Sequence, residues 1–318
     1  MAATKPNLAE LVERMPATDK ELEALKPPPP TQGDATQPKP RPRPEKPGGS
    51  KFTAPDPDVA AKICDEILAG GRDSLAELIG LIRDPASDDF KNYKAEYLLH
   101  CLTIHVGRPE KEPLRRQFID TLAEQLGRRE LPVHARGFLL RELQLIGDKA
   151  AARAVGTFLT DEQLCDDAAR TLLAINDGAV EQFRNALPGA TGRRRLVIVQ
   201  SLAVLKDAGS ADALKQAVTD ANREIRLAAV WGLARIGDAA FTDLLLKAAD
   251  TKETWERNKA TQACFLLAEN LAASGKKTEA AKIYTQLRNT RTEASEQYIR
   301  DAATKALAAF GGKLALKD

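Results

Sequence analysis

The chain has 318 residues, and its 47 lysine and arginine residues stand against 45 aspartate and glutamate residues, for a formal net charge of +2. This even balance lacks the basic excess of a typical nucleic-acid-binding domain, so we expect no nucleic-acid partner. No run approaches the roughly 18 apolar residues of a membrane span, and no basic stretch followed by an apolar core predicts a signal peptide. We therefore expect a cytoplasmic protein without a membrane segment, although an exported protein supplied without its signal peptide would look the same.

The first 57 residues separate into two parts. Residues 1–26 contain two short helical patterns, over 8–15 and 19–25. Residues 27–57 contain 11 of the 18 prolines of the chain. Proline removes an amide donor and fixes φ, so we expect a disordered linker with polyproline II character. Lysine and arginine alternate with these prolines, which we interpret as a spacer kept soluble by charge; a ligand for an SH3-like groove or an anionic surface is the alternative.

Residues 130–250 contain a two-helix unit repeated about every 30 residues, over 130–160, 161–189, 190–219 and 220–250. Each unit has an aspartate in the turn between its helices, and these lie 29, 30 and 31 positions apart: Asp148, Asp177, Asp207 and Asp238. Twelve positions before each stand Arg136, Cys165, Arg195 and Arg226. One helix pair cannot bury its apolar face alone, so the repetition predicts stacked units.

Weaker copies extend the pattern over 58–312. Upstream we expect helices at 60–68, 75–82, 90–106 and 113–126. Downstream we expect a longer helix at 255–273, a unit at 253–290 that resembles a tetratricopeptide repeat, and a capping helix at 294–310 that stops at Gly311-Gly312. No stretch alternates with a period of two between hairpin turns, so the folded part is predicted to be all-α.

The repeated residues resemble the HEAT repeat, and the short period is similar to the bacterial HEAT-like kind also found in phycobilin lyases and deoxyhypusine hydroxylase. The resemblance rests on an Ala-rich first helix, a Gly-Asp turn and an acid six positions before an arginine. It implies a right-handed α–α superhelix with a structural Asp–Arg ladder between neighbouring repeats. The candidate ladder residues are Arg136, Arg195, Arg226, Asp220 and Glu130. Cys165 and the missing acid before Arg195 predict an interruption in the middle of this ladder.

No catalytic constellation stands out in the sequence. The four cysteines include no CxxC pair and are predicted to be buried free thiols. His100 and His105 lie about 140° apart around a helix, whereas a shared metal requires a spacing of three or four residues. There is no His-Glu dipeptide, no Gly-x-Ser-x-Gly elbow and no phosphate-binding loop. We therefore predict no catalytic residue, no cofactor and no metal.

The second helices of the repeats carry cations at near-regular spacing. If the HEAT resemblance holds, these helices line the concave surface, where a partner would meet Arg153, Arg184, Lys215 and Lys247. Their positions drift relative to the turn aspartate, and acidic residues lie among them. We therefore interpret them as part of a mixed-charge surface, with a continuous anion-binding groove as the alternative.

Two tryptophans are further candidates for partner binding. Trp231 occupies a position that is polar in the sister repeats, Leu227 makes its flank more apolar, and Trp255 opens the next helix pair. A large aromatic residue on a polar flank is typical of an interface anchor. The alternative, which the usual burial of tryptophan favours, is that the two pack together where the repeat lengthens.

Two hypotheses for the function follow. The first is a non-enzymatic α-solenoid scaffold that binds another protein along its surface. The second is a HEAT-like enzyme or accessory subunit with a shallow groove, similar to a bilin lyase or an alkylpurine DNA glycosylase. A glycosylase would need a basic groove with clustered aromatic residues, and the chain has only 2 Trp and 4 Tyr. We favour the scaffold, whose partner the sequence does not identify.

Overall fold

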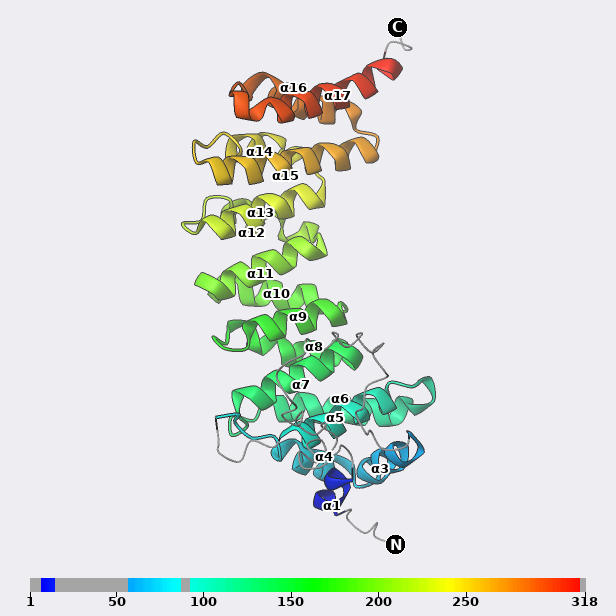
Figure 1. The fold of residues 1–318 in the computed structure, drawn as a ribbon. Helices are drawn as coiled ribbons and strands as arrows, with labels where there is room; N and C mark the ends of the chain where they lie inside the picture. The colour runs from blue at the N-terminus through cyan, green and yellow to red at the C-terminus, as the bar shows by residue number, and fades with distance from the viewer. Residues whose placement is uncertain (1–6, 15–56, 87–91, 315–318) are drawn as a thin grey trace, which may run out of the picture. The chain divides into compact units, whose positions relative to one another are not determined.

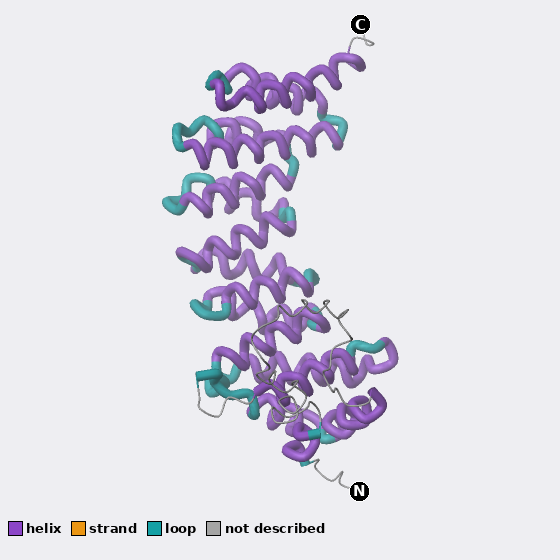
Figure 2. The backbone as a smooth tube through the Cα atoms, in the orientation of Figure 1, coloured by secondary structure: helices purple, strands orange, loops and turns teal. Residues whose placement is uncertain are grey.

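The computed structural model describes residues 7–14, 57–86 and 92–314. Within these ranges every regular element is a helix, and none is a strand (Figure 2). The predicted all-α repeat fold is thus confirmed. The predicted helix at 19–25 lies outside the described residues, and so does the predicted linker at 27–57 apart from Pro57, which begins α3.

The chain divides into two compact units, Met1–Ala154 and Val155–Asp318. The division falls within α8, Lys149–Gly156. In the first unit the helices before α8 are α1 Leu8–Glu13, α3 Pro57–Ala69, α4 Gly71–Gly80, α5 Asn92–Val106, α6 Glu112–Leu126 and α7 Val133–Ile146. The domain boundaries proposed from the sequence remain predictions.

The short helix α1 packs against α4 and α5 of the first unit. Its apolar residues Leu8, Leu11 and Val12, spaced three and four apart, are at most 8% exposed. Glu13 at the end of α1 forms an ion pair with Lys94 of α5, whose side chain is 7% exposed. An amphipathic face and an ion pair to a buried lysine therefore fix this N-terminal helix to the folded unit.

The second unit contains nine α-helices among its described residues: α9 Cys165–Ile175, α10 Ala179–Ala186, α11 Gly192–Leu205, α12 Ala211–Ala217, α13 Arg223–Ile236, α14 Thr242–Ala248, α15 Thr254–Ala273, α16 Lys277–Thr290 and α17 Gln297–Leu314. We call α9, α11, α13, α15 and α17 the first helices, and α10, α12, α14 and α16 the second helices. The helices from α9 to α15 form two layers, because α9, α11, α13 and α15 each pack on the next while α10, α12 and α14 pack behind them (Figure 1).

Small residues let neighbouring first helices approach closely. A Cβ atom added at Gly232 of α13 would lie 2.9 Å from the Cβ of Ala203 on α11, so no larger residue fits without a shift. The turn residues act locally. Gly237 ends α13 with φ of 79°, and the Asp238 carboxylate accepts a hydrogen bond from the Ala240 amide at 3.0 Å. This is why the Gly-Asp pair marks the reversal between two helices.

The C-terminal helices are longer than those of the regular repeats. The helix expected at 255–273 is α15, and the apolar residues expected to pack in α16 are buried, including Ile283 and Tyr284. The capping helix was expected to stop at Gly311-Gly312, but α17 continues through both glycines to Leu314. A helical glycine costs about 1 kcal/mol, which weakens a helix without ending it. The resemblance of 253–290 to a tetratricopeptide unit remains a prediction.

No helix in the described ranges has both the length and the apolar content that crossing a membrane requires.

The docking of α1 predicts a stability effect. Replacing Leu11, 3% exposed, by alanine removes buried contacts and should lower the free energy of unfolding of the first unit by about 2 kcal/mol. Urea denaturation of the full chain measures the change, and Glu10→Ala, an exposed position of the same helix, is the control. If Leu11→Ala and Glu10→Ala unfold at the same urea concentration as the unaltered chain, α1 does not contribute to the folded unit.

Candidate partner-binding groove

An arginine at the fourth position of α13 connects two repeats. Arg226 Nη1 donates hydrogen bonds to the carbonyl oxygens of Asp220 and Ala221, in the loop before its own helix, at 2.8 and 3.1 Å. Its Nε and Nη2 donate to the carboxylate of Glu256 on α15, at 2.6 and 2.8 Å. The planar guanidinium thus satisfies loop carbonyls and binds the next first helix at the same time.

Arginines at the same helix position bind an acid of the following repeat elsewhere in the second unit. Arg195, fourth in α11, donates through Nε to the carboxylate of Asp220 at 2.9 Å. Arg257, fourth in α15, donates through Nε to Glu296 at 2.6 Å and also contacts the carbonyl oxygen of Thr251 at 3.4 Å. We call the contacts of Arg195, Arg226 and Arg257 with Asp220, Glu256 and Glu296 the arginine ladder.

The arginine ladder lowers the pKa values of the acids that it binds. Hydrogen bonds from Arg226 lower the pKa of Glu256, and those from Arg257 lower the pKa of Glu296. The pKa of Asp220 is lowered first by the Asn222 backbone amide and then by Arg195. All three carboxylates therefore stay ionised at pH values below the ordinary pKa range of their residue types.

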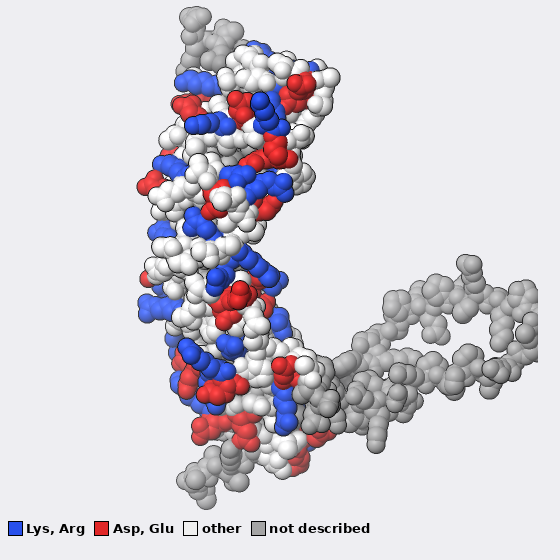
Figure 3. All heavy atoms as spheres, turned by 90° about the vertical axis from the view of Figure 1, so that its left-hand side faces the viewer, with Lys and Arg blue, Asp and Glu red and all other residues white. Residues whose placement is uncertain are grey.

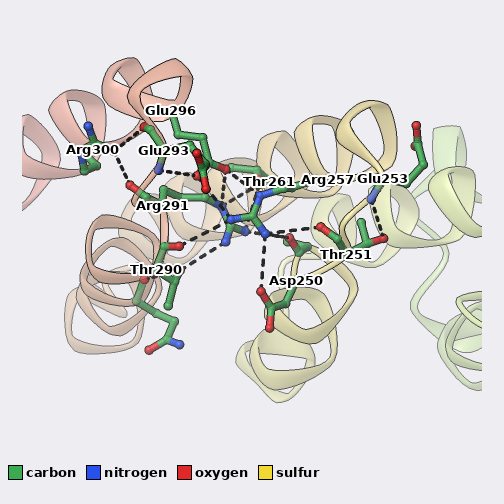
Figure 4. A network of polar contacts seen from close by, with 12 residues as sticks. Asp250, Thr251, Glu253, Arg257, Thr261, Thr290, Arg291, Glu293, Glu296 and Arg300 are labelled. Carbon is green, nitrogen blue, oxygen red and sulfur yellow. Dashed lines mark hydrogen bonds and ion pairs between the residues drawn. The ribbon is translucent and has the colours of Figure 1, made fainter.

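A buried arginine reinforces the last step of the ladder. Arg291, at the end of α16, is 2% exposed and donates to the carbonyl oxygen of Ala249 at 2.9 Å and to the hydroxyl of Thr261 at 3.2 Å. Figure 4 shows Arg257 and Arg291 converging on Glu296 from two helices. Glu256, Arg257, Arg291 and Glu296 were not among the residues predicted from the sequence, although Arg257 is fourth in its helix, as Arg195 and Arg226 are.

Two of the predicted ladder residues, Glu130 and Arg136, do not make the ladder contacts. Glu130 is exposed and lies 3.7 Å from Arg128 Nε, which is a surface contact within one loop. Arg136 is fourth in α7, but its Nε is buried without a hydrogen-bond partner among the described residues. Spacing from an arginine did not identify its main acidic partner, because the carboxylate nearest to each ladder arginine comes from the following repeat; among the described residues, only Arg257 also contacts a carboxylate in its own preceding loop, Asp250 at 3.5 Å.

The four cations predicted to line a concave surface have different surroundings. Arg184 binds the carboxylate of Asp207, and Lys215 binds Asp212 at 3.0 Å. Arg153 and Lys247 are exposed. On the face that Figure 3 displays, basic and acidic side chains are interspersed. These observations support a mixed-charge surface over a continuous anion-binding groove.

The histidines contact carboxylates, and the cysteines are buried or half-buried. Each histidine contacts a carboxylate on another helix: His100 with Glu142 at 3.1 Å, His105 with Asp65 at 2.8 Å and His134 with Glu96 at 2.5 Å. Burial raises the pKa of Cys64 and of Cys264 to about 12, so neither thiol is poised to ionise. Cys101 is only half-buried, in contrast to the predicted full burial. The described residues contain no group of three or more candidate metal ligands.

The two tryptophans line one groove on the first helices, and neither is buried. Trp231 on α13 is 37% exposed and Trp255 on α15 is 51% exposed. The groove has a volume of about 610 Å³, and its other apolar lining residues are Val204, Leu227, Ala228, Ala263 and Leu266, from α11, α13 and α15. We call it the Trp groove. The alternative in which the tryptophans fill a buried junction does not agree with these exposures.

The apolar surface continues from the Trp groove towards α17. A shallower hollow between α15 and α17 shares Gln262 and Leu266 with the Trp groove and is also lined by Tyr298, which is 59% exposed. Among the described residues of the second unit, the exposed large apolar residues are Val204, Trp231, Trp255 and Tyr298. All of them lie on first helices and line these two hollows.

Comparison with known proteins agrees with the repeat assignment. Residues 180–264 match the family described as HEAT repeats. The chain is similar to the crystal structure of an engineered protein, with 18% identity and a TM-score of 0.42, over 80% of this chain and 75% of that chain. It is also similar to human deoxyhypusine hydroxylase in complex with glycerol, with 14% identity and a TM-score of 0.30, over 81% of this chain and 92% of that chain. No curated protein matches the sequence.

The matched residues extend from α10 into α15, and so include both tryptophans. Residues 180–264 therefore carry HEAT repeats, as the turn and arginine spacing predicted, and the described residues on either side continue the helical fold. Neither TM-score is high enough to support an inference about activity.

The arginine ladder predicts an acid-sensitive second unit. Because the folded-state pKa values of Asp220, Glu256 and Glu296 are lowered, the unfolded chain binds more protons, and stability is lost as the pH falls below about 4.3. Arg226→Gln should lower the free energy of unfolding at neutral pH by about 1–3 kcal/mol and reduce this acid dependence.

Urea denaturation between neutral pH and pH 3 measures both effects. The matched control is Arg223→Gln on the same helix, because its pair with Glu224 is about half exposed and should contribute less than about 1 kcal/mol. Equal losses in the two variants, or an unchanged pH profile in Arg226→Gln, would show that the ladder contact is not stabilising.

Proposed function

We propose that this protein is a non-enzymatic scaffold that binds another protein through the first-helix face of residues 155–318. One observation carries the proposal. Among the described residues of this unit, every exposed large apolar side chain lines the Trp groove or the adjoining hollow. Scattered apolar residues on a surface need no explanation, but a contiguous set that includes two tryptophans is typical of an interaction site.

The chemistry of the Trp groove favours binding over catalysis. Its lining includes one carboxylate and one amine, Glu224 and Lys259, and the remaining polar residues are Gln200 and Gln262. Glu224 pairs with Arg223 at 3.2 Å, which leaves it poorly placed as a general base. Aromatic and aliphatic side chains bordered by polar residues match the anatomy of a protein interface.

The HEAT-like enzyme hypothesis gains no specific support from the described residues. The histidines are held by carboxylates on neighbouring helices, and the ladder acids are held by arginines. These groups therefore have structural partners, which explains their presence without a reaction. A cytoplasmic location remains a prediction.

Substitution of the two tryptophans tests the proposal. The variant with Trp231→Gln and Trp255→Gln should lose partner capture from a native lysate, because truncating an interface anchor costs about 2 kcal/mol or more. Its melting temperature should change little, since both side chains are exposed in the free protein. Affinity capture followed by mass spectrometry, with a melting curve for each variant, measures the two outcomes.

The matched control for this experiment is Leu145→Gln, which replaces a 56% exposed apolar residue of the first unit. It should retain the captured partner. Capture of the same proteins by the double tryptophan variant as by the unaltered chain would refute binding through this face.

A further inference from the structure

Two cations border the Trp groove, and neither has a carboxylate partner among the described residues. The guanidinium carbon of Arg235 lies 4.5 Å from the centre of the Trp231 ring, and Lys259 Nζ lies 4.8 Å from the centre of the Trp255 ring. In both pairs the cation follows its tryptophan by four residues, so one helical turn brings the two together. Cation–π contact holds each charge at the groove and leaves its N–H donors available.

The carboxylates on α13 and at the start of α15 beside the groove are already engaged, and Glu269, farther along α15, lines the adjoining hollow and not the groove. Glu224 pairs with Arg223, and Glu256 binds Arg226. The Glu253 carboxylate caps α15 by accepting hydrogen bonds from the amides of Trp255 and Glu256, at 3.4 and 2.8 Å. The charge left without a partner at the groove is therefore positive, and Arg235 and Lys259 carry it.

We infer that the Trp groove binds an acidic amphipathic α-helix of another protein. This inference rests on the proposed function and narrows it to one class of partner. Apolar side chains of the helix contact Trp231, Trp255 and Leu227, and carboxylates beside them meet Arg235 and Lys259. Charge complementarity selects an acidic partner over a neutral or basic one.

The walls of the groove favour a helical partner over an extended one. They are the side faces of α11, α13 and α15, and the amides and carbonyls in the middle of an α-helix are bonded within that helix. An extended segment would find no main-chain partners there, whereas a helix satisfies its own. Neighbouring helices lie about 8–10 Å apart, so the groove spans roughly 20 Å, or about 13 helical residues.

The proline-rich segment of this chain has the wrong charge for the groove. Its cations Lys39, Arg41, Arg43 and Lys46 have the same sign as Arg235 and Lys259. The segment would therefore bring like charges together, and we assign the groove to a different protein.

The chain has only two tryptophans, and both line the groove, so intrinsic fluorescence reports its occupancy. The probe is a displayed library of amphipathic helical peptides. All peptides share one apolar face, and the positions beside that face can be Glu, Gln or Lys. The library is selected for binding to the full chain. We expect enrichment of Glu. The selected Glu peptide should shift the tryptophan emission to shorter wavelength, and its Gln version should bind about tenfold more weakly at low salt.

Charge reversal supplies the matched test. The variant with Arg235→Glu and Lys259→Glu should bind the Glu peptide at least about tenfold more weakly and gain affinity for the Lys peptide. The control variant with Lys282→Glu and Arg288→Glu makes the same change in net charge at exposed positions of α16 and should bind the Glu peptide as before.

Each other outcome overturns the inference. If the selected peptides carry Lys, or no charge, at these positions, the partner is not acidic, but the proposed scaffold function is unaffected. Failure of every peptide to shift the emission, while the tryptophan variant still loses its captured protein, excludes a helical segment as the occupant. Binding of a peptide of residues 27–57 assigns the groove to the chain's own segment. Self-association that needs the same tryptophans assigns it to a second copy.

Discussion

The arginine ladder meets two requirements of stacked helix pairs. The loop before each first helix contains carbonyl groups that have no partner within a helix, and the neighbouring first helices must be held in register. One guanidinium meets both needs, as Arg226 does by bonding two loop carbonyls and both oxygens of Glu256. Because these side chains are less than a third exposed, water screens their contacts less than those of a surface ion pair.

This ladder leaves the outer faces of the first helices free for recognition. On α13 the buried side chains Ile225, Ala229 and Leu233 face the core, while Trp231 faces solvent. The tight approach of α11 and α13 at Gly232 keeps the two helices close, so residues from both contribute to the Trp groove. A rigid frame that presents apolar side chains loses little conformational entropy on binding, which suits a scaffold.

The histidines and the ladder acids hold helices together. His100, His105 and His134 each contact a carboxylate on another helix, and the ladder acids have lowered pKa values because arginines donate to them. Perturbed pKa values often mark active sites, but structural ion-pair networks produce them as well. Here the perturbed acids lie between repeats, away from a cluster of potential nucleophiles, so a structural origin accounts for them.

The sequence by itself determined the helical repeat, its period and its turns, because these depend on local properties. Apolar spacing along one helix, the left-handed conformation open to Gly237 and the capping carboxylate of Asp238 act within a few residues. The sequence also identified Trp231 as unusual for its position in the repeat, and Trp255 as the residue that opens the next helix pair. It could not pair Arg226 with Glu256 or Arg257 with Glu296, because these acids lie 30 and 39 positions away and belong to the following units.

Only the tertiary structure decided whether the tryptophans are buried, since that depends on how closely α11, α13 and α15 approach one another. It also decided that α1 packs against α4 and α5, because no nearby residue of the sequence signals the partner of a six-residue helix.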